Sequence, residues 1–573
     1  MMSTRDRWTA AVLGLSAVVV GVFLVFKPFA SVPVLAIGVG LGCGVLGVHE
    51  ALRIRGTRTP LLTAAAAALW LIVGVALLAW PGVTVWVIAV AAGVGLIVTG
   101  VLDLIGAVRR AGDNRLPDAL LGAAAIVAGS VALSWPDVTI FVVAVVVGIR
   151  LLWFGFGRLT DAVRGRAQGD DQVPTRADRV RRTILAAVAF VAALALGAAG
   201  VIAQVNTPRP DAFYDAPDEI PAEPGHLLRA ESFDRQVPDN ARAWRILYTS
   251  TRDDGRPALA SALVVAPKTP GAQPHPVIAW AHGTTGVARG CAPSILDDPF
   301  TAGATPALRQ VVDAGWVLVA TDYIGLGTAS PHPYLIGQGE GRSVLDSVRA
   351  ARMLTELRLS DKTVVWGHSQ GGHAALWTGI LAPTYAPDVP LAGVAALAPA
   401  ANLTGLVASL EQMTGGAIFA AYVLEAYRQE YPDIGFDLAR VAARLPLREM
   451  AARCLAEPEV FVSIVSSLIV GNRFFAGDPT QGAMGRRLVQ NIPSAPLSMP
   501  VFIGQGADDS LVTPTAQRDF VSRQCAAGSV IDYRTYPGRG HIDLVAATDS
   551  ALIGDLLGWT ADRFAGRPAA STC

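Results

Sequence analysis

Two patterns of hydrophobic residues follow one another along this chain of 573 residues. Up to about residue 205, long runs of Ala, Val, Leu, Ile and Gly contain almost no charged side chains. Each run is close to the ~20 residues that a helix needs to cross a lipid bilayer. We therefore predict an N-terminal all-α bundle of about seven transmembrane spans within residues 1–205, at 8–26, 30–50, 60–80, 82–107, 117–135, 138–157 and 183–205.

A different pattern begins after residue 205. Residues 206–240 are rich in Pro, Asp and Glu, which is typical of a linker and entry segment. Short apolar runs then alternate with helical ones, and strands separated by helices form a mostly parallel sheet with helices on both faces. This pattern predicts an α/β domain over residues 241–573. Its strands are expected at 260–266, 277–281, 316–321, 363–366, 391–397, 500–504 and 530–536, and its helices at 341–358 and 370–382.

Composition agrees with two physically different halves. The chain is 52% hydrophobic and only 16% charged, whereas soluble globular proteins carry about 25% charged residues. The net charge is zero, but Lys and Arg exceed Asp and Glu in the first half, and the second half carries the matching acidic excess. Neither half is basic enough to suggest nucleic-acid binding, so we expect no nucleic-acid partner.

Charges in the connectors predict how the spans are oriented. Lys and Arg stay preferentially on the cytoplasmic side of a membrane. Basic segments that begin at Arg5, Arg53, Arg109 and Arg158 alternate with connectors whose only cation is Lys27. We therefore expect a multi-pass plasma membrane protein with a cytoplasmic N-terminus. After an odd number of spans, the C-terminal domain emerges on the extracytoplasmic side.

The membrane half also repeats itself. Phe26-Lys27-Pro28, Trp80-Pro81 and Trp135-Pro136 place a proline at positions 28, 81 and 136, and an apolar helix follows each. This periodicity predicts three helical hairpins and one extra span. Over residues 10–165 the pattern resembles the short-repeat, acid-resistance (HdeD-like) membrane family, a resemblance that implies no defined chemistry.

The motif that carries chemistry is Gly367-His368-Ser369-Gln370-Gly371, a G-x-S-x-G sequence directly after the apolar run 363–366. In this setting the serine occupies a sharp, strained turn, and glycines two positions away let strand and helix approach each other. A helix that starts at Gln370 also aims its N-terminal amides at the site. The motif predicts an α/β hydrolase with Ser369 as nucleophile.

A serine hydroxyl needs a base, and the base needs a group that orients it. In this fold the chain order is Ser, then Asp or Glu, then His. His541 is the only histidine after His373, so it is the predicted base. Asp508 and Asp509 both follow the strand expected at 500–504. We favour Asp509, because an apolar residue stands three positions after it, and Asp508 stays the alternative.

The negative charge of a tetrahedral intermediate requires fixed backbone amides nearby. One amide is expected from Gln370, directly after the nucleophile. The other should come from the turn after the strand at 277–281, where we assign Thr284, with Thr285 close behind. His282 in the same turn precedes the nucleophile and is interpreted as a residue that braces the loop.

Cysteine usage fits an oxidising compartment. Cys43 lies in a span, whereas Cys291, Cys454, Cys525 and Cys573 lie in the C-terminal domain. An even number there predicts two disulfides, with three connectivities open. Because no Cys or His cluster has metal-ligand spacing, we expect no metal, and no other motif indicates a cofactor.

The second half resembles the secretory lipase family of α/β hydrolases, which includes fungal lipase A-type enzymes, over about residues 225–573. The matching stretches are 291–294, 320–327, 343–351, 367–374, 454–455, 524–526 and Cys573. The resemblance implies an enzyme that cleaves acylglycerols or similar esters, with Ser369, Asp509 and His541 as its triad. It also implies pairing of Cys291 with Cys454 and of Cys525 with Cys573.

The segment between the predicted nucleophile and acid is longer than the core of the domain needs. Residues 400–495 are largely helical and apolar, so we expect a cap insertion that covers the active site and binds acyl chains. The sequence thus predicts a membrane-anchored, extracytoplasmic serine ester hydrolase. Its partners are a lipid or other ester substrate and the lipid bilayer. Acyl transfer to envelope alcohols by the same triad, and a non-catalytic stress or scaffold protein, are the alternatives.

Overall fold

The computed structural model describes residues 4–26, 81–109, 115–134, 176–205, 208–269 and 271–573, together with short helical stretches between residues 48 and 75 and between 151 and 163. The chain forms two compact units. The first comprises Met1–Asn206, Ala439–Glu449 and Ile464–Phe474, and the second comprises Thr207–Leu438, Met450–Ser463 and Phe475–Cys573. The spans expected at 30–50, 60–80 and 138–157 lie wholly or mostly outside the described residues.

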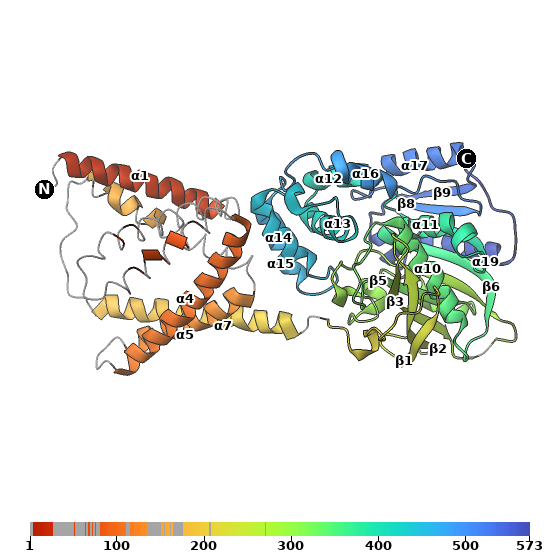
Figure 1. Cartoon of the computed structure of the whole chain (residues 1–573), viewed down its shortest axis with the longest axis horizontal. Coiled ribbons are helices and arrows are strands. Elements are labelled where there is room, and N and C mark those ends of the chain that lie inside the picture. The colour runs from red at the N-terminus through yellow and green to blue at the C-terminus, as the bar shows by residue number, and fades with distance from the viewer. Residues whose placement is uncertain are drawn as a thin grey trace. The chain divides into compact units, whose positions relative to one another are not determined.

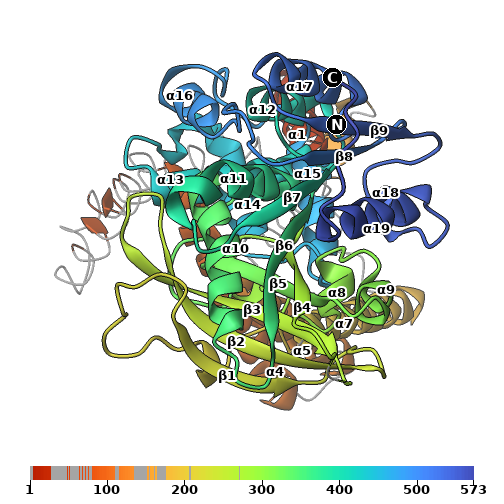
Figure 2. The same cartoon turned by 90° about the vertical axis from the view of Figure 1, so that its right-hand side faces the viewer.

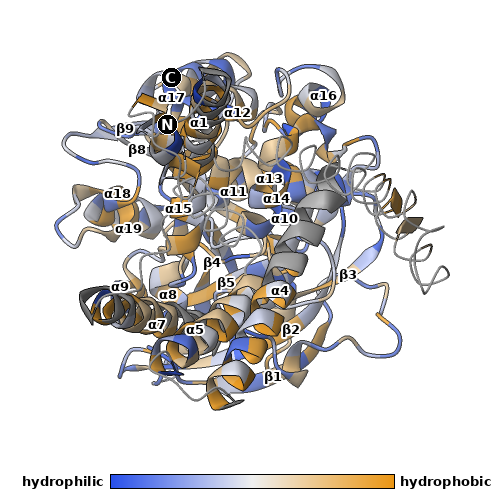
Figure 3. Ribbon diagram, turned by 90° about the vertical axis from the view of Figure 1, so that its left-hand side faces the viewer, coloured by the Kyte–Doolittle hydropathy of each residue, from blue (hydrophilic) through white to orange (hydrophobic). Residues whose placement is uncertain are grey.

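Long helices make up the described N-terminal region (Figure 1). They cover the spans expected at 8–26, 82–107, 117–135 and 183–205, as α1 (Thr4–Phe26), α4 (Pro81–Arg109), α5 (Arg115–Ser134) and α7 (Arg176–Val205). Hydrophobic residues run along α4 and α5 (Figure 3). Among the described residues, only Arg115–Leu133 is both long and apolar enough to cross a membrane, and Gly93–Val108 and Thr183–Ala195 are shorter apolar helices.

Glycines set the contact between α4 and α5. A Cβ atom on Gly100 would lie 2.5 Å from the carbonyl oxygen of Gly122, and one on Gly129 would lie 2.6 Å from that of Gly93. The two glycines of each helix are seven residues apart, and the pairs run in opposite directions along the chain. Small residues that let helix backbones touch are typical of helix pairs inside membranes.

A nine-stranded sheet organises the second unit (Figure 2). Its spatial order is β1-β2-β3-β5-β4-β6-β7-β8-β9. The antiparallel edge consists of β1 (Leu227–Phe233), β2 (Ala241–Thr251) and β3 (Pro257–Pro267). The other six strands are parallel: β5 (Val317–Ile324), β4 (His275–Ala281), β6 (Leu359–His368), β7 (Leu391–Leu397), β8 (Val501–Gly506) and β9 (Ile531–Tyr536).

Helices cover both faces of this sheet, because side chains along each central strand alternate between two cores. On β4, Val277 and Ala279 face one core, which receives α10 (Gly337–Arg352), α11 (Gln370–Tyr385) and α17 (Pro514–Ala526). Ile278 and Trp280 face the other core, which receives α9 (Leu308–Asp313), α18 (Asp543–Ala546) and α19 (Ala551–Phe564). The expected mostly parallel α/β architecture is confirmed.

Between β7 and β8 the chain is helical, where the sequence predicts a cap insertion. The helices there are α12 (Leu403–Ser409), α13 (Gly416–Glu430), α14 (Val441–Ala451), α15 (Val460–Val470) and α16 (Gly482–Gln490). A further short helix, α8 (Pro299–Ala302), follows β4.

The structure adds elements that the hydrophobic pattern did not reveal. Strand β2 carries Arg242 and Arg245 among buried residues, which interrupts a simple apolar run. Strand β1 lies inside the segment 206–240, which the sequence indicated as a linker and entry segment, and it pairs with β2 just after that segment. Helix α10 begins at Gly337, earlier than expected, and ends at Arg352. A Cβ atom at Gly337 would overlap the indole ring of Trp377, so a glycine there allows α10 to pack closely on α11.

Two disulfides tie loops to this framework. Cys291, in the segment after β4, bonds to Cys454, three residues after the end of α14, and Cys525 on α17 bonds to Cys573. Of the three connectivities open to four cysteines, this is the one that the secretory lipase resemblance implies. The first bond ties the segment after α14 to the segment after β4, which also contains Thr284.

Candidate active site

Ser369 sits at a sharp turn between β6 and α11. Its φ is 57° and its ψ is −115°, in a region of backbone space that a non-glycine residue rarely occupies. Cβ atoms on Gly367 and Gly371 would overlap the carbonyl groups of Gly371 and Ala281, respectively. Only glycine fits at these two positions, which explains their spacing around the serine. The turn leaves the Ser369 side chain half-buried at the carboxyl end of the sheet.

Ser369, His541 and Asp509 form one chain of hydrogen bonds. The distance from His541 Nε2 to Ser369 Oγ is 2.8 Å, and the distance from His541 Nδ1 to Asp509 Oδ2 is also 2.8 Å. Because Asp509 accepts at Nδ1, that nitrogen carries the proton, and Nε2 faces the serine hydroxyl as an acceptor. This tautomer is the one in which an imidazole can remove the hydroxyl proton.

The protein holds the carboxylate of Asp509 through several donors. Oδ1 accepts the backbone N–H groups of Leu511 and Val512 at 2.9 and 2.8 Å, and Oδ2 also accepts the side-chain amide of Gln505 at 3.1 Å. Burial alone would raise the pKa of Asp509. The hydrogen bond and charge of His541 and the two backbone donors outweigh this, so its pKa is lowered. Asp509 is therefore ionised, and its geometry is fixed.

Asp508, the alternative acid, lies elsewhere. Its side chain is exposed, whereas that of Asp509 is buried. Its backbone N–H donates to the carbonyl oxygen of Arg539 at 2.9 Å, so the residue helps to join the two loops that follow β8 and β9. The structure brings Asp509, and not Asp508, to the imidazole of His541.

The turn after β4 lies beside the serine. A Cβ atom on Gly283 would come within 4.0 Å of the Cβ atom of Ser369, and Thr284 and Gln370 line the same hollow as Ser369. Thr285 is buried and turned away, because its hydroxyl donates to the carbonyl oxygen of Cys291 at 2.8 Å. Of the two threonines in this turn, Thr284 is the one at the site.

Two buried histidines near the serine are neutral. Burial lowers the pKa of His368 to about 3 and that of His282 to about 4. His368 Nε2 lies 2.9 Å from the carbonyl oxygen of His541, and the two imidazole rings are 4.8 Å apart. His282 Nδ1 lies 2.6 Å from the carbonyl oxygen of Gly283. These residues brace the loops on which His541 and Thr284 lie.

An apolar hollow opens beside Ser369. Its lining includes hydrophobic side chains from the helical segment after β7 and from the loop after Asp509. These are Leu406, Leu410, Phe419, Val423, Leu511 and Val512. Such a surface holds water poorly, so it favours apolar groups next to the reactive hydroxyl.

Three further residues belong to the site, although no sequence pattern pointed to them: Tyr334, Glu340 and Gln505. Gln505 braces the acid, and the Tyr334 hydroxyl lies 3.0 Å from Thr284 Oγ1. Glu340 accepts the side-chain amide of Gln370 at 2.8 Å. For Glu340, the one available signal was that it is the only acidic residue in the Gly-rich start of its helix. Among the described residues, no group of three or more His, Cys, Asp or Glu side chains could hold a metal ion.

Comparison with known families agrees with this geometry. Residues 301–572 match the family model described as secretory lipase. Residues 65–120 and 120–174 each match the model of a short repeat of unknown function, DUF308. The two resemblances expected from the sequence are thus confirmed for the two parts of the chain.

Curated relatives point to the same class of enzyme. The chain is 26% identical over 416 residues to the secreted triacylglycerol lipase LIP3 of Malassezia globosa, covering 68% of this chain and 89% of that protein. It is 25% identical over 406 residues to lipase 6 of Candida albicans, covering 64% of this chain and 84% of that protein. Both relatives are named as lipases, and the first as a triacylglycerol lipase, which supports an ester hydrolase of that type.

A solved structure shares the fold of the C-terminal part. Lipase A of Candida antarctica superposes with a TM-score of 0.54 at 20% identity, covering 63% of this chain and 87% of that chain. The same enzyme in its closed state gives a TM-score of 0.53 at 21% identity. The sheet and its helices are therefore those of an α/β hydrolase.

The two neighbouring aspartates allow a matched test of the site. We expect Asp509→Asn to lower kcat for a p-nitrophenyl ester about 10³- to 10⁴-fold, because an amide cannot hold the reactive tautomer of His541. Asp508→Asn should change kcat by less than about twofold, since its exposed side chain does not contact the imidazole. Equal losses in the two variants, or a larger loss in Asp508→Asn, would contradict the assignment.

Proposed function

We propose that the chain is a membrane-anchored, extracytoplasmic serine ester hydrolase that acts on acylglycerols or related esters through an acyl-enzyme. The observation that carries the proposal is the unbroken chain of hydrogen bonds from Ser369 through His541 to Asp509, at 2.8 Å for each link. Binding and scaffold proteins have no need of such an arrangement, since its only consequence is to make one hydroxyl reactive.

In the proposed reaction, His541 Nε2 takes the hydroxyl proton as Ser369 Oγ attacks the ester carbonyl. His541 then returns this proton to the departing alcohol, which leaves an acyl group on Ser369. Water then attacks the acyl carbonyl while His541 Nε2 takes a proton from it. His541 returns this proton to Ser369 Oγ, and the carboxylic acid leaves. Asp509 stays ionised throughout and stabilises the imidazolium that forms in each half of the reaction.

The oxyanion is proposed to be held by the backbone N–H groups of Gln370 and Thr284. Within residues 208–269 and 271–573, neither N–H donates to a protein acceptor, so both are available for a substrate oxygen. Gln370 also begins α11, whose N-terminal dipole favours negative charge at this point. Removing one such donor costs roughly 3 kcal/mol of transition-state stabilisation in serine hydrolases.

The apolar hollow supports an acyl chain as the part of the substrate next to the serine. Leu406, Leu410 and Phe419, three of its lining residues, belong to the helical segment that we propose as the cap. Relatives that carry the name triacylglycerol lipase support acylglycerols as the substrate class. A cap over the ester would also keep bulk water from the reacting atoms.

Membrane anchoring rests on the N-terminal half. Its support is the matched short repeat over 65–120 and 120–174, the long apolar helices α1, α4, α5 and α7, and the alternation of basic connectors along the sequence. We propose about seven spans and a catalytic domain on the extracytoplasmic side. Two disulfides in that domain agree with an oxidising compartment.

The substrate proposal is tested with p-nitrophenyl esters of increasing chain length on the purified full-length protein. We expect kcat/KM to rise up to chains of about ten carbons or more, because each buried CH₂ adds about 0.8 kcal/mol of binding. Leu406→Trp should narrow the hollow and shift the preference to shorter chains. Val489→Trp is the control, since Val489 is exposed on α16 and lies away from the hollow.

A preference for two- to four-carbon chains, unchanged in Leu406→Trp, would contradict the assignment of the hollow to an acyl chain.

The side of the membrane on which the catalytic domain lies is tested on intact cells that express the protein. A membrane-impermeant fluorophosphonate should label the wild type as strongly on intact cells as in lysates, because the serine faces the outside. Ser369→Ala should label in neither sample. Labelling in lysates alone would place the catalytic domain in the cytoplasm and contradict the proposed topology.

A further inference from the structure

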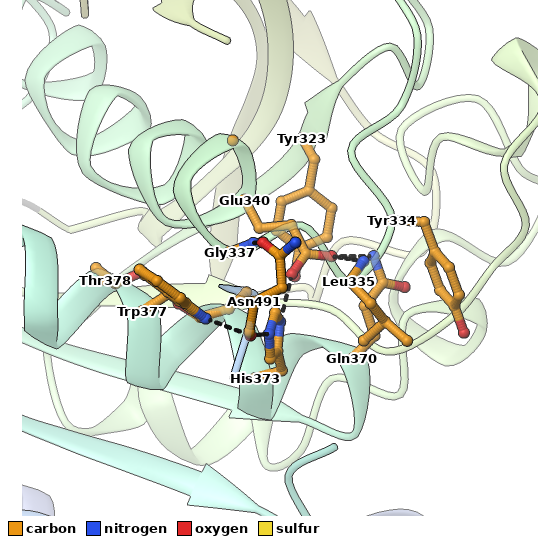
Figure 4. Close-up of polar contacts among 12 residues, drawn as sticks. Tyr323, Tyr334, Leu335, Gly337, Glu340, Gln370, His373, Trp377, Thr378 and Asn491 are labelled. Carbon is orange, nitrogen blue, oxygen red and sulfur yellow. Dashed lines mark hydrogen bonds and ion pairs between the residues drawn. The ribbon is translucent and has the colours of Figure 1, made fainter. Parts of the chain in front are cut away.

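A fully buried carboxylate lies behind the nucleophile, outside the triad. Glu340 on α10 is 0% exposed, and three hydrogen bonds hold it (Figure 4). Its Oε1 accepts the backbone N–H of Leu335 at 3.0 Å and the side-chain amide of Gln370 at 2.8 Å. Its Oε2 lies 2.8 Å from Nδ1 of His373 on α11. An ionised group this deep is costly unless it is paired.

The contacts of His373 fix a proton at Nε2 and pair Nδ1 with Glu340. Nδ1 faces the Glu340 carboxylate, and Nε2 lies 2.8 Å from the backbone carbonyl oxygen of Asn491, which can only accept. That oxygen also accepts the indole N–H of Trp377 at 2.9 Å. An ionised Glu340 makes both contacts acceptors, so in that state both ring nitrogens of His373 carry protons and the imidazolium neutralises the carboxylate.

The hydrogen bonds around the side-chain amide of Gln370 can be assigned in the same way. His332 Nδ1 lies 3.0 Å from the carbonyl oxygen of Ile324 and therefore donates, which leaves His332 Nε2 as an acceptor. Burial lowers the pKa of His332 to about 3, in agreement with a neutral ring. The two N–H bonds of the Gln370 amide then go to His332 Nε2 at 3.2 Å and to Glu340 Oε1 at 2.8 Å. Both donors are satisfied, so the side chain has one orientation.

The carboxylate thereby reaches both sides of the proposed oxyanion site. On one side it holds Gln370, the residue directly after the nucleophile. On the other it holds the backbone of Leu335, which has a positive φ of 55° and follows Tyr334. The Tyr334 hydroxyl lies 3.0 Å from Thr284 Oγ1. One charged group therefore connects the two residues whose backbone amides face the ester oxygen.

We propose that Glu340, paired with His373, is a positioning residue that sets the oxyanion site by fixing Gln370 directly and Thr284 through Leu335 and Tyr334. The inference rests on the proposed ester hydrolysis, and it concerns how the site is held rather than which residues react. The imidazolium also has an electrostatic role, because an unpaired carboxylate at this depth would oppose the negative charge that develops on the ester oxygen.

A purely structural role for this pair is the alternative outcome, and the same helix offers a matched control. Asp346, six residues after Glu340 on α10, is also 0% exposed. It bonds to Ser250, Tyr385 and Arg349, none of which lines the hollow at Ser369. Asp346→Asn therefore measures what the fold loses with a buried carboxylate, without touching the site.

The experiment compares Glu340→Gln with Asp346→Asn in the purified full-length protein. Active sites are counted by the p-nitrophenol burst, so that unfolded molecules do not enter kcat. We expect Glu340→Gln to lower kcat about tenfold to a hundredfold with KM changed by less than about twofold, because an uncharged amide holds Leu335 and Gln370 more weakly than a carboxylate does and leaves His373 without its charged partner. Asp346→Asn should keep kcat per active site within about twofold of the wild type.

An unchanged kcat per active site in Glu340→Gln, or an equal loss in Asp346→Asn, would overturn the positioning role. If Glu340→Gln yields no folded protein, His373→Gln replaces it with the same expectations, since it leaves the carboxylate unpaired at the same place.

A second readout does not depend on turnover and separates this inference from the proposed function. In full-length protein with ¹⁵N-labelled histidine, the ring nitrogens of His373, assigned by their loss in His373→Gln, should both carry protons at pH 8. A neutral His373 ring in the wild type would overturn the ion pair whether or not the protein hydrolyses esters. Conversely, a wild type without esterase activity would refute the proposed function even with the ion pair intact.

Discussion

The close approach of β6, α11 and β4 around Ser369 is the constraint on which the rest of the site depends. Side chains at positions 367 and 371 would collide with backbone carbonyl groups. The turn can form only because both residues are glycines. The turn holds Ser369 in a strained conformation that costs of order 1–3 kcal/mol, which the packed sheet below it supports. This turn places the hydroxyl of Ser369 at the carboxyl end of the sheet, where residues from the other loops contact it.

Parallel strands bring those loops together. Because β4, β6, β8 and β9 run in the same direction, the turns that carry Thr284, Ser369, Asp509 and His541 all leave one edge of the sheet. Buried polar groups then fix each loop: Gln505 and two backbone amides hold the acid, His368 contacts the loop of the base, and Glu340 holds the elements beside the oxyanion site. The reactive serine is half-buried, whereas the side chains that support these loops are fully buried.

The sequence was informative where chemistry is local and less so where it depends on packing. The G-x-S-x-G turn, the late His541 and the acid after β8 could be predicted because each has a fixed place in chain order. Strand β2 was missed because its arginines break the apolar run. Glu340 and His373 could not be paired from sequence, since 33 positions separate them and only the contact of α10 with α11 brings them together.

The proposed mechanism requires that the hydroxyl of Ser369 becomes covalently acylated. Rapid quenching of the full-length protein during hydrolysis of a long-chain p-nitrophenyl ester, followed by peptide mass spectrometry, tests it most directly. The account predicts an acyl group on the peptide that contains Ser369, and neither adduct nor hydrolysis in Ser369→Ala. Hydrolysis that persists in Ser369→Ala, or an adduct on another residue, would contradict it.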